Sequence, residues 1–222
     1  MRVVLFGASG MVGQGVLREC LADPGVESVL AIGRSPLGAA HPKVEEIVHR
    51  DFLDFTAIEP RLADRDACFF CLGVSSAGMT EESYRRVTYD ITLAAARSLV
   101  RASPGMTFIY VSGAGTDSTE RGKSMWARVK GETENALLSL PFGHACMFRP
   151  AIIAPGRGIR SKTAAYRLFY SVSRPLLPIA GALFPGFVVT SGQIGRAMIA
   201  VVRRGPPRAV LESREIRAWG GG

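Results

Sequence analysis

Cysteine and histidine are scarce in this chain of 222 residues, which contains four of the first and three of the second. Cys68 and Cys71 are close in sequence, but they lie in "ACFFCLG", an apolar run typical of a buried strand. Side chains three residues apart on a strand point to opposite faces, so these thiols would not meet. The histidines are scattered, and we expect neither a metal site nor redox chemistry at the cysteine pair.

Long apolar runs are also missing. The most apolar late stretch, residues 168–189, contains Arg174 and three prolines, which makes it a poor membrane span. The opening "MRVVLFGASG" is broken by glycine too early for a signal peptide. We therefore expect a cytoplasmic protein with no membrane span.

Acidic residues are rare in the last third of the chain. Residues 151–222 contain 11 lysines and arginines but only two acidic residues, whereas residues 1–150 contain 16 and 17. The excess could be a solvated basic surface, or it could attract an anionic substrate, nucleic acid or acidic lipid. Nucleic acid is the least favoured of these, because the sequence has neither an RNP-like motif nor an aromatic stacking pattern.

Strand-like apolar runs alternate with helical patterns over the first 153 residues. Strands are predicted within 2–6, 26–33, 44–54, 66–73, 106–113 and 144–153, and helices at 11–22, 80–102 and 124–140. Thr80 would cap the second helix, with glutamates in its first turn. This alternation predicts a doubly wound α/β fold with a parallel sheet, which binds ligands at the carboxyl ends of its strands.

The regular alternation of strand and helix patterns ends after Ile153. Residues 161–185 could form a helix and loop over the strand ends, followed by a helix at 190–205 and a short strand within 208–216. We expect one domain, with a dinucleotide-binding core at 1–156 and a small substrate-side lobe at 157–222. The expected partner is a small-molecule substrate, and an anionic group on it would face Arg157, Arg160, Lys162 and Arg167.

The stretch "FGASGMVGQG" joins the first strand to the first helix and places Gly7, Gly10 and Gly13 at G-x-x-G-x-x-G spacing. The first glycine would permit a tight turn, the second a close approach to a pyrophosphate, and the third close packing of helix on strand. A helix that merely contains several glycines would lose about 1 kcal/mol at each relative to alanine, which favours a ligand. The predicted phosphate site also includes Ala8, Ser9, Met11 and Val12.

The second strand ends in "AIGRSP", where enzymes that select NAD often carry an acidic residue. Arg34 and Ser35 stand there instead, and a guanidinium suits a 2′-phosphate, so NADP(H) is expected over NAD(H). Asp51 could accept from the adenine amino group, with Phe52 or Leu53 packed on the ring. An ordinary turn with a core phenylalanine is an equal alternative.

These residues together resemble the short-chain dehydrogenase/reductase superfamily in its extended or atypical branch, with relatives among NAD-dependent epimerases and dehydratases. The resemblance is strongest to small NAD(P)-binding proteins of the Tat-interacting-protein type. It is carried by "GASGMVG", "IGRSP", "CLGVSS", "YVSGAG", "VKGETE", "FRPAIIAPGR" and the late "VVTSGQIGRAMIAVV" with "VLESREI".

The resemblance implies roles for further residues. Those that would line the cofactor ribose or meet the nicotinamide are Cys71, Leu72, Gly73, Pro150, Ala151, Ile152 and Ile153. Lys130 matches the family lysine, which binds the ribose hydroxyls of the nicotinamide half and lowers the pKa of a catalytic tyrosine.

The chain departs from that family at the acid itself. Trp126 stands where the tyrosine is expected, four residues before Lys130 and on the same helical face. The family's Ser-Ser pair reads Ser112-Gly113, so its serine is also in question. Indole can donate a hydrogen bond but cannot deliver a proton.

Three functions stay open on this evidence. The first is an NADP-dependent oxidoreductase with Lys130 and Ser112 as catalytic candidates, in which Tyr110, Tyr166, Tyr170, Ser112 or a water on Lys130 supplies the acid. The second is a non-catalytic NADP(H)-binding regulator. The third is a module that binds nucleic acid or an acidic membrane surface.

Overall fold

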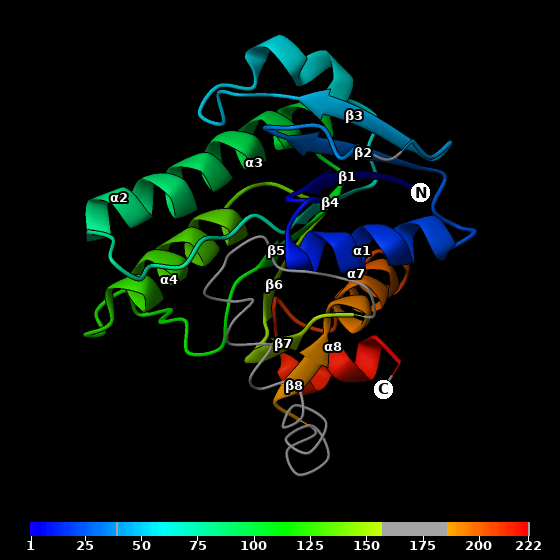
Figure 1. The fold of residues 1–222 in the computed structure, drawn as a ribbon. Helices are drawn as coiled ribbons and strands as arrows, with labels where there is room; N and C mark the ends of the chain where they lie inside the picture. The colour runs from blue at the N-terminus through cyan, green and yellow to red at the C-terminus, as the bar shows by residue number, and fades with distance from the viewer. Residues whose placement is uncertain (39, 157–185, 222) are drawn as a thin grey trace.

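The computed structural model describes residues 1–38, 40–156 and 186–221. Its centre is a seven-stranded sheet in the order β3-β2-β1-β4-β5-β6-β9, with every neighbouring pair parallel (Figure 1). The strands are β1 (Arg2–Phe6), β2 (Ser28–Gly33), β3 (Val44–Val48), β4 (Ala67–Phe70), β5 (Thr107–Val111), β6 (His144–Arg149) and β9 (Val210–Glu212). The predicted doubly wound α/β fold is confirmed.

Helices cover both faces of this sheet (Figure 1). One face carries α1 (Met11–Ala22) and α7 (Ser191–Arg204), with α8 (Ser213–Trp219) beside α7. The other carries the 3₁₀ helix η1 (Thr56–Leu62), α2 (Glu81–Arg85), the π-helical turn η2 (Arg86–Asp90), α3 (Ile91–Ala102) and α4 (Met125–Leu138).

The central strands are apolar along their whole length because both of their faces are buried. Every residue of β4 and β5 is buried, and alternate residues join two separate clusters. Cys68 lies in the cluster under α3, whereas Cys71 packs against the one under α1 and α7, as the strand pattern predicts.

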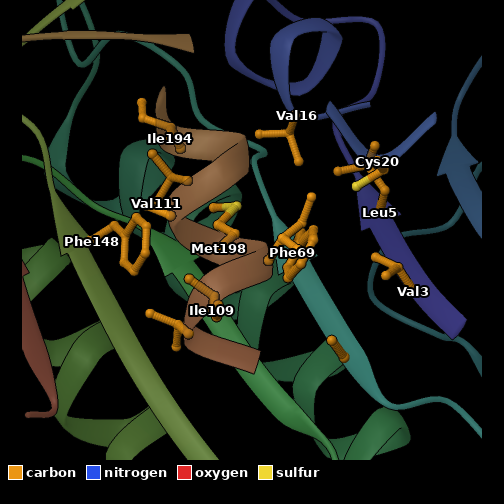
Figure 2. Close-up of a cluster of buried hydrophobic side chains, with 14 of the residues drawn as sticks. Val3, Leu5, Val16, Cys20, Phe69, Ile109, Val111, Phe148, Ile194 and Met198 are labelled. Atoms are coloured by element: carbon orange, nitrogen blue, oxygen red, sulfur yellow. The ribbon is translucent and has the colours of Figure 1, made fainter. Parts of the chain in front are cut away.

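Helix α7 supplies much of the core on the α1 side. Figure 2 shows Ile194 and Met198 pointing among Val16, Phe69 and Phe148, which come from α1, β4 and β6. The described residues after 185 therefore share a core with the glycine-rich loop, and β9 extends the main sheet. The helix and loop expected at 161–185 lie outside the described residues.

Thr80 caps α2 as predicted, since its Oγ1 accepts from the amide of Ser83 at 3.2 Å. The predicted helix over 80–102 forms as three joined pieces, with the π turn η2 between α2 and α3. Along the described parts of the chain, we find no helix with the length and apolar character that crossing a membrane requires.

The strand predicted at 144–153 is shorter than expected. The run 144–153 breaks at Pro150, and Ile152–Ala154 forms β7, which pairs with β8 (Val188–Thr190) in a separate small sheet. Proline has no amide proton to continue a ladder. The run 208–216 gives only β9, because Glu212 and Glu215 form a capping box that starts α8 at Ser213.

Candidate cofactor site and cleft

Gly7 turns the chain from β1 towards α1 with a φ of +77°. A Cβ placed there would lie 2.7 Å from the carbonyl oxygen of Cys71, which follows the neighbouring strand β4. Both the left-handed conformation and the close contact exclude a larger residue. The turn is closed by the Gly10 amide, which donates to the Gly7 oxygen at 2.9 Å.

The N-terminus of α1 is built to accept an anion. Gly10 caps the helix without a side chain, and residues 11–14 include no carboxylate. A Cβ at Gly13 would lie 2.0 Å from the Gly7 oxygen, so glycine is what lets helix and loop pack this closely. The amides of the first turn and the positive end of the helix dipole therefore suit a phosphate, and the loop fits a dinucleotide.

The remaining predicted phosphate residues lie around this turn. Ala8 is buried at 4% exposure, while Ser9, Met11 and Val12 keep partly exposed surfaces. The backbone carbonyl oxygen of Ser9 accepts from Gln14 Nε2 at 2.9 Å, which ties the loop to the first turn of α1. Cys71 and Leu72 are partly exposed and Gly73 is exposed beyond the end of β4, beside the loop.

Arg34 and Ser35 are both exposed directly after β2. Arg50, which was not among the predicted cofactor residues, is also exposed and lies two residues beyond the end of β3. Gly33 pairs with Val48 in the parallel register, so Arg34 and Arg50 leave neighbouring strands at the same edge. A second basic residue shortly after the third predicted strand was the sequence feature that could have indicated it.

The three residues expected near adenine occupy different environments. Phe52 is 7% exposed and packs edge-on against Phe6 and Phe55, so it lies in the core. Asp51 is exposed, and its Oδ1 accepts from the Leu53 amide at 3.0 Å within the turn. Leu53, at 43% exposure, presents the apolar surface here that a ring could cover.

Ser112 lies at the end of β5, but its hydroxyl is engaged within the protein. Thr116 Oγ1 donates to the Gly113 oxygen at 2.7 Å and lies 3.0 Å from Ser112 Oγ. Because the threonine proton is already committed, the serine is the donor in that second bond. Ser112 is 9% exposed. Its hydroxyl therefore stabilises the loop and is not placed to donate to a substrate.

Lys130 reaches from α4 to the sheet and meets Tyr110 of β5. Its Nζ lies 3.3 Å from the tyrosine Oη and 5.1 Å from the ring centroid. Burial lowers the pKa of Lys130 to about 8, and the nearby Glu134 acts in the opposite direction. Burial also raises the pKa of Tyr110, so this phenol stays protonated.

Glu134, one turn beyond Lys130 on α4, is 1% exposed. Arg149 at the end of β6 binds it through Nε at 3.0 and 3.1 Å and also donates to Ser118 Oγ at 2.6 Å. This buried pair was not among the predicted site residues, although an ionisable residue on the buried face of α4 indicated it.

Trp126 is partly exposed, and its indole extends towards the loop after β5. A Cβ placed at Gly115 would lie 3.5 Å from Trp126 Cη2, so the far edge of the ring reaches this loop. A Cβ at Gly113 would meet nothing within 4 Å. Trp126 and Lys130 thus leave α4 on the side facing the carboxyl end of β5.

The segment after β6 uses its first amides internally. The Ala151 amide donates to Ser213 Oγ at 2.7 Å, and the Ile152 amide to the Phe187 oxygen at 3.1 Å. The buried Pro150 accepts at its oxygen from Ala114, while the side chain of Ile152 is 40% exposed. A nicotinamide carboxamide would therefore have to displace these bonds or meet other backbone groups here.

A hollow of about 340 Å³ lies elsewhere, between α1 and the start of α7. Arg196 on its wall binds Glu19 at 3.1 Å and donates to the Gly220 oxygen at 2.7 Å. None of the predicted cofactor residues lines it. This hollow is separate from the glycine-rich loop. Arg157, Arg160, Lys162, Arg167, Tyr166 and Tyr170, which were expected near the cleft, lie outside the described residues.

No model of a known protein family matches the sequence. Curated relatives nevertheless cover most of it. Protein fmp52, mitochondrial, of Emericella nidulans is 27% identical over 204 residues, 89% of this chain and 85% of that protein. Protein HTATIP2 of Rattus norvegicus is 29% identical over 154 residues, 68% of this chain and 62% of that protein.

Solved structures share the fold at lower identity. The Bordetella bronchiseptica enzyme WbmF, in complex with NAD⁺, superposes with a TM-score of 0.68 at 14% identity, over 99% of this chain and 76% of that one. Uronate dehydrogenase from Agrobacterium tumefaciens gives 0.65 at 20% identity, over 96% and 76%. These curated relatives, both below 30% identity, support a place in the atypical short-chain dehydrogenase/reductase superfamily. The solved structures show that the chain shares the Rossmann fold of NAD-binding proteins.

The relatives overturn the predicted cytoplasmic location. The fungal relatives, including that of Saccharomyces cerevisiae at 28% identity over 169 residues, are named mitochondrial. The cytoplasmic prediction is wrong because it rested on two missing features, a membrane span and a signal peptide. Neither absence separates the cytoplasm from an organelle.

Proposed function

We propose that this protein is an NADP(H)-dependent oxidoreductase acting on a small carbonyl compound or alcohol, without the usual tyrosine acid. When bound, the nicotinamide cofactor supplies or removes the two electrons of the reaction. The observation that carries the proposal is Lys130, a partly exposed lysine of lowered pKa beside the carboxyl end of β5. Such a group can exchange a proton near neutral pH.

The cofactor half of the proposal rests on the loop and on Arg34. The uncapped amides of α1 would hold the pyrophosphate, and Arg34 would bind the 2′-phosphate. Lys130 would also donate to ribose hydroxyls, as the superfamily resemblance implies. An anionic substrate remains part of the proposal because of the basic residues at 157–167.

Turnover tests the proposal directly. NADPH oxidation, followed by absorbance with a panel of aldehydes, ketones and quinones, is expected to exceed the background rate for at least one compound. Gly10→Ala is the matched control: its Cβ would lie 3.3 Å from the Gly7 oxygen, a tight contact that needs only a small shift of the loop, and the methyl would block the phosphate. Activity that persists in Gly10→Ala would contradict use of this site.

A non-catalytic NADP(H)-binding regulator is the second candidate. The internal bonding of Ser112 and the replacement of the acid by Trp126 favour it, since neither residue is then placed to give up a proton. Calorimetric binding of NADPH with no turnover of any panel compound would favour this function over the first.

A further inference from the structure

Resting on the proposed oxidoreductase function, we propose that Lys130 Nζ is the proton donor and acceptor of this site, and that Tyr110 is its positioning residue. The lysine takes over the acid role for which Trp126 is unsuited. Tyr110, which lies on β5, holds the amine near the carboxyl end of the sheet and does not itself react.

The geometry gives Tyr110 a use in both protonation states of the lysine. Its Oη lies 3.3 Å from Nζ, and a phenol both donates and accepts hydrogen bonds. It can accept from the ammonium before proton transfer and donate to the neutral amine afterwards. The ring, 5.1 Å from Nζ at its centroid, adds a cation–π attraction for the charged state.

The charges around Lys130 are otherwise compensated. Glu134 on the same helix is bound to Arg149 of β6. On the helices packed against α4, Arg85 of α2 pairs with Glu132 and with Asp90 of η2. The buried phenol of Tyr84, also on α2, raises the pKa of Tyr110.

Burial is consequently the largest influence on Lys130 and lowers its pKa to about 8. An amine with a pKa near the working pH is charged often enough to give a proton and neutral often enough to take one. The raised pKa of Tyr110 keeps its proton in place, so the phenol positions Lys130 and does not replace it. Ser112 is excluded because its hydroxyl donates its hydrogen bond to Thr116 Oγ1.

The step balances with this chain's own proton. When a carbonyl carbon accepts a hydride (one hydrogen with its two electrons) from the reduced cofactor, a C–H bond would form and the C=O π pair would move to oxygen; the Nζ–H bond breaks and an O–H bond forms on that oxygen. Lys130 is left as a neutral amine hydrogen-bonded to Tyr110, and water returns its proton. Alcohol oxidation runs the same steps in reverse, with the neutral amine as base.

The first test is the titration of Lys130 in the full chain without cofactor. The chain has only four lysines, so ¹³C-dimethyl-lysine NMR gives few signals, and Lys130→Arg assigns the one of interest. The expected midpoint is about 8. In Tyr110→Phe, which keeps the ring but removes the acceptor for the ammonium, the midpoint should fall by about 0.5–1 pH unit.

The second test is the pH profile of NADPH-dependent turnover. In Tyr110→Phe, the pH at which carbonyl reduction declines on the alkaline side should move lower by the same number of pH units as the NMR midpoint. Phe108→Leu is the matched control, because Phe108 lies two residues earlier on the same face of β5. It loosens the core but should leave the pH profile unchanged. A profile unchanged in Tyr110→Phe would overturn the role of Tyr110.

Lys130→Arg separates proton transfer from cofactor binding. Arginine keeps the positive charge and hydrogen-bond donors but does not release a proton, so NADPH affinity should fall by less than about fivefold while kcat falls about 10²-fold or more. Undiminished kcat in Lys130→Arg, with an unchanged pH profile, overturns this inference alone. No turnover by the parent protein overturns the proposed function and the inference with it.

Discussion

Arg34 lies exposed one residue beyond the end of β2, where this fold places the adenosine ribose of a dinucleotide. Replacing it by alanine should weaken NADPH binding at least about tenfold, because a charge-assisted contact to the 2′-phosphate is lost. NADH has no such phosphate, so its affinity should change little. Calorimetry with both cofactors measures the difference.

Arg97→Ala is the control for that substitution, since Arg97 is an exposed arginine on α3. Equal affinities of the unmodified protein for NADPH and NADH would contradict the preference itself. Arg50→Ala forms a further arm of the experiment. A loss as large as that of Arg34→Ala would mean that the two arginines share the phosphate.

Trp126 can be converted into the missing acid. Trp126→Tyr combined with Gly113→Ser should raise carbonyl reduction, but by less than the about 10²–10⁴-fold that a first positioned proton donor supplies, because Lys130 already donates a proton. The added Cβ at position 113 meets open space, so the serine should be tolerated. Trp126→Phe with Gly113→Ser supplies a ring without a proton and should give no increase. An equal rise in both double variants would show that packing is responsible.

Lys130 should make folding depend on pH in alkaline solution. Its folded-state pKa of about 8 lies below its ordinary value of 10.5, so between these pH values the unfolded chain binds more protons. The free energy of unfolding therefore rises with pH across this window. Lys130→Met should be more stable than the parent by about 1–3 kcal/mol at pH 7, and the gain should shrink towards pH 10.5.

Urea unfolding at pH 7 and pH 9.5 measures that effect. Lys123→Met is the comparison, because Lys123 is exposed in the loop before α4. A gain for Lys130→Met that is equal at both pH values would mean that it comes from added apolar contact and not from the removal of a desolvated charge.

The position of a single side chain can be predicted from the sequence in some cases and not in others. Helical spacing was enough to place Trp126 and Lys130 on one side of α4. The hydrogen bond between Lys130 and Tyr110 was beyond that reasoning, because it depends on how α4 lies over β5. The same holds for Ser112, whose hydroxyl donates a hydrogen bond to Thr116, four residues further on.

At the scale of elements, α1 is held between the glycine-rich loop and α7. A Cβ at Gly15 would lie 2.4 Å from Ser191 Cβ and 2.7 Å from its carbonyl carbon. Gly15→Ala should therefore push the two helices apart and lower the free energy of unfolding by about 1–3 kcal/mol, as overpacked sites do. Urea denaturation measures the change.

Gly105→Ala is the matched control, because a Cβ at Gly105 would meet nothing within 4 Å. NADPH affinity should fall in Gly15→Ala but not in Gly105→Ala, since a displaced α1 carries the phosphate-binding amides with it. Wild-type stability in Gly15→Ala would show that the α1–α7 contact is looser than these distances indicate.

The predicted elements succeed where local pattern and burial agree. The strands β1, β4 and β5 are buried on both faces, and such strands leave an uninterrupted apolar run in the sequence. The prediction at 144–153 extended too far, because β6 ends before Pro150 and Ile152–Ala154 pairs instead with the distant strand β8. Only this second cause lies beyond what a local pattern can show.

At the scale of the whole molecule, the basic excess of the last third is partly neutralised by the first third. Arg203 of α7 binds Asp23 at the end of α1, and Arg196 binds Glu19 one turn earlier. Charge counted along the sequence therefore overstates the charge of the surface around α7. An anionic partner is therefore best tested by substituting the basic residues at 157–167.

The position of α7 and β9 also bears on how the protein is made. Helix α1 emerges early from the ribosome, but the helix that packs on it begins only at Ser191, and the strand beside β6 begins only at Val210. The nascent sheet must wait with one apolar face half covered and an open edge, the state in which chains aggregate or recruit chaperones. Contacts this distant in sequence also slow folding. A ribosome stalled before residue 191 should therefore hold a protease-sensitive chain, whereas one stalled well beyond β9 should hold a resistant one.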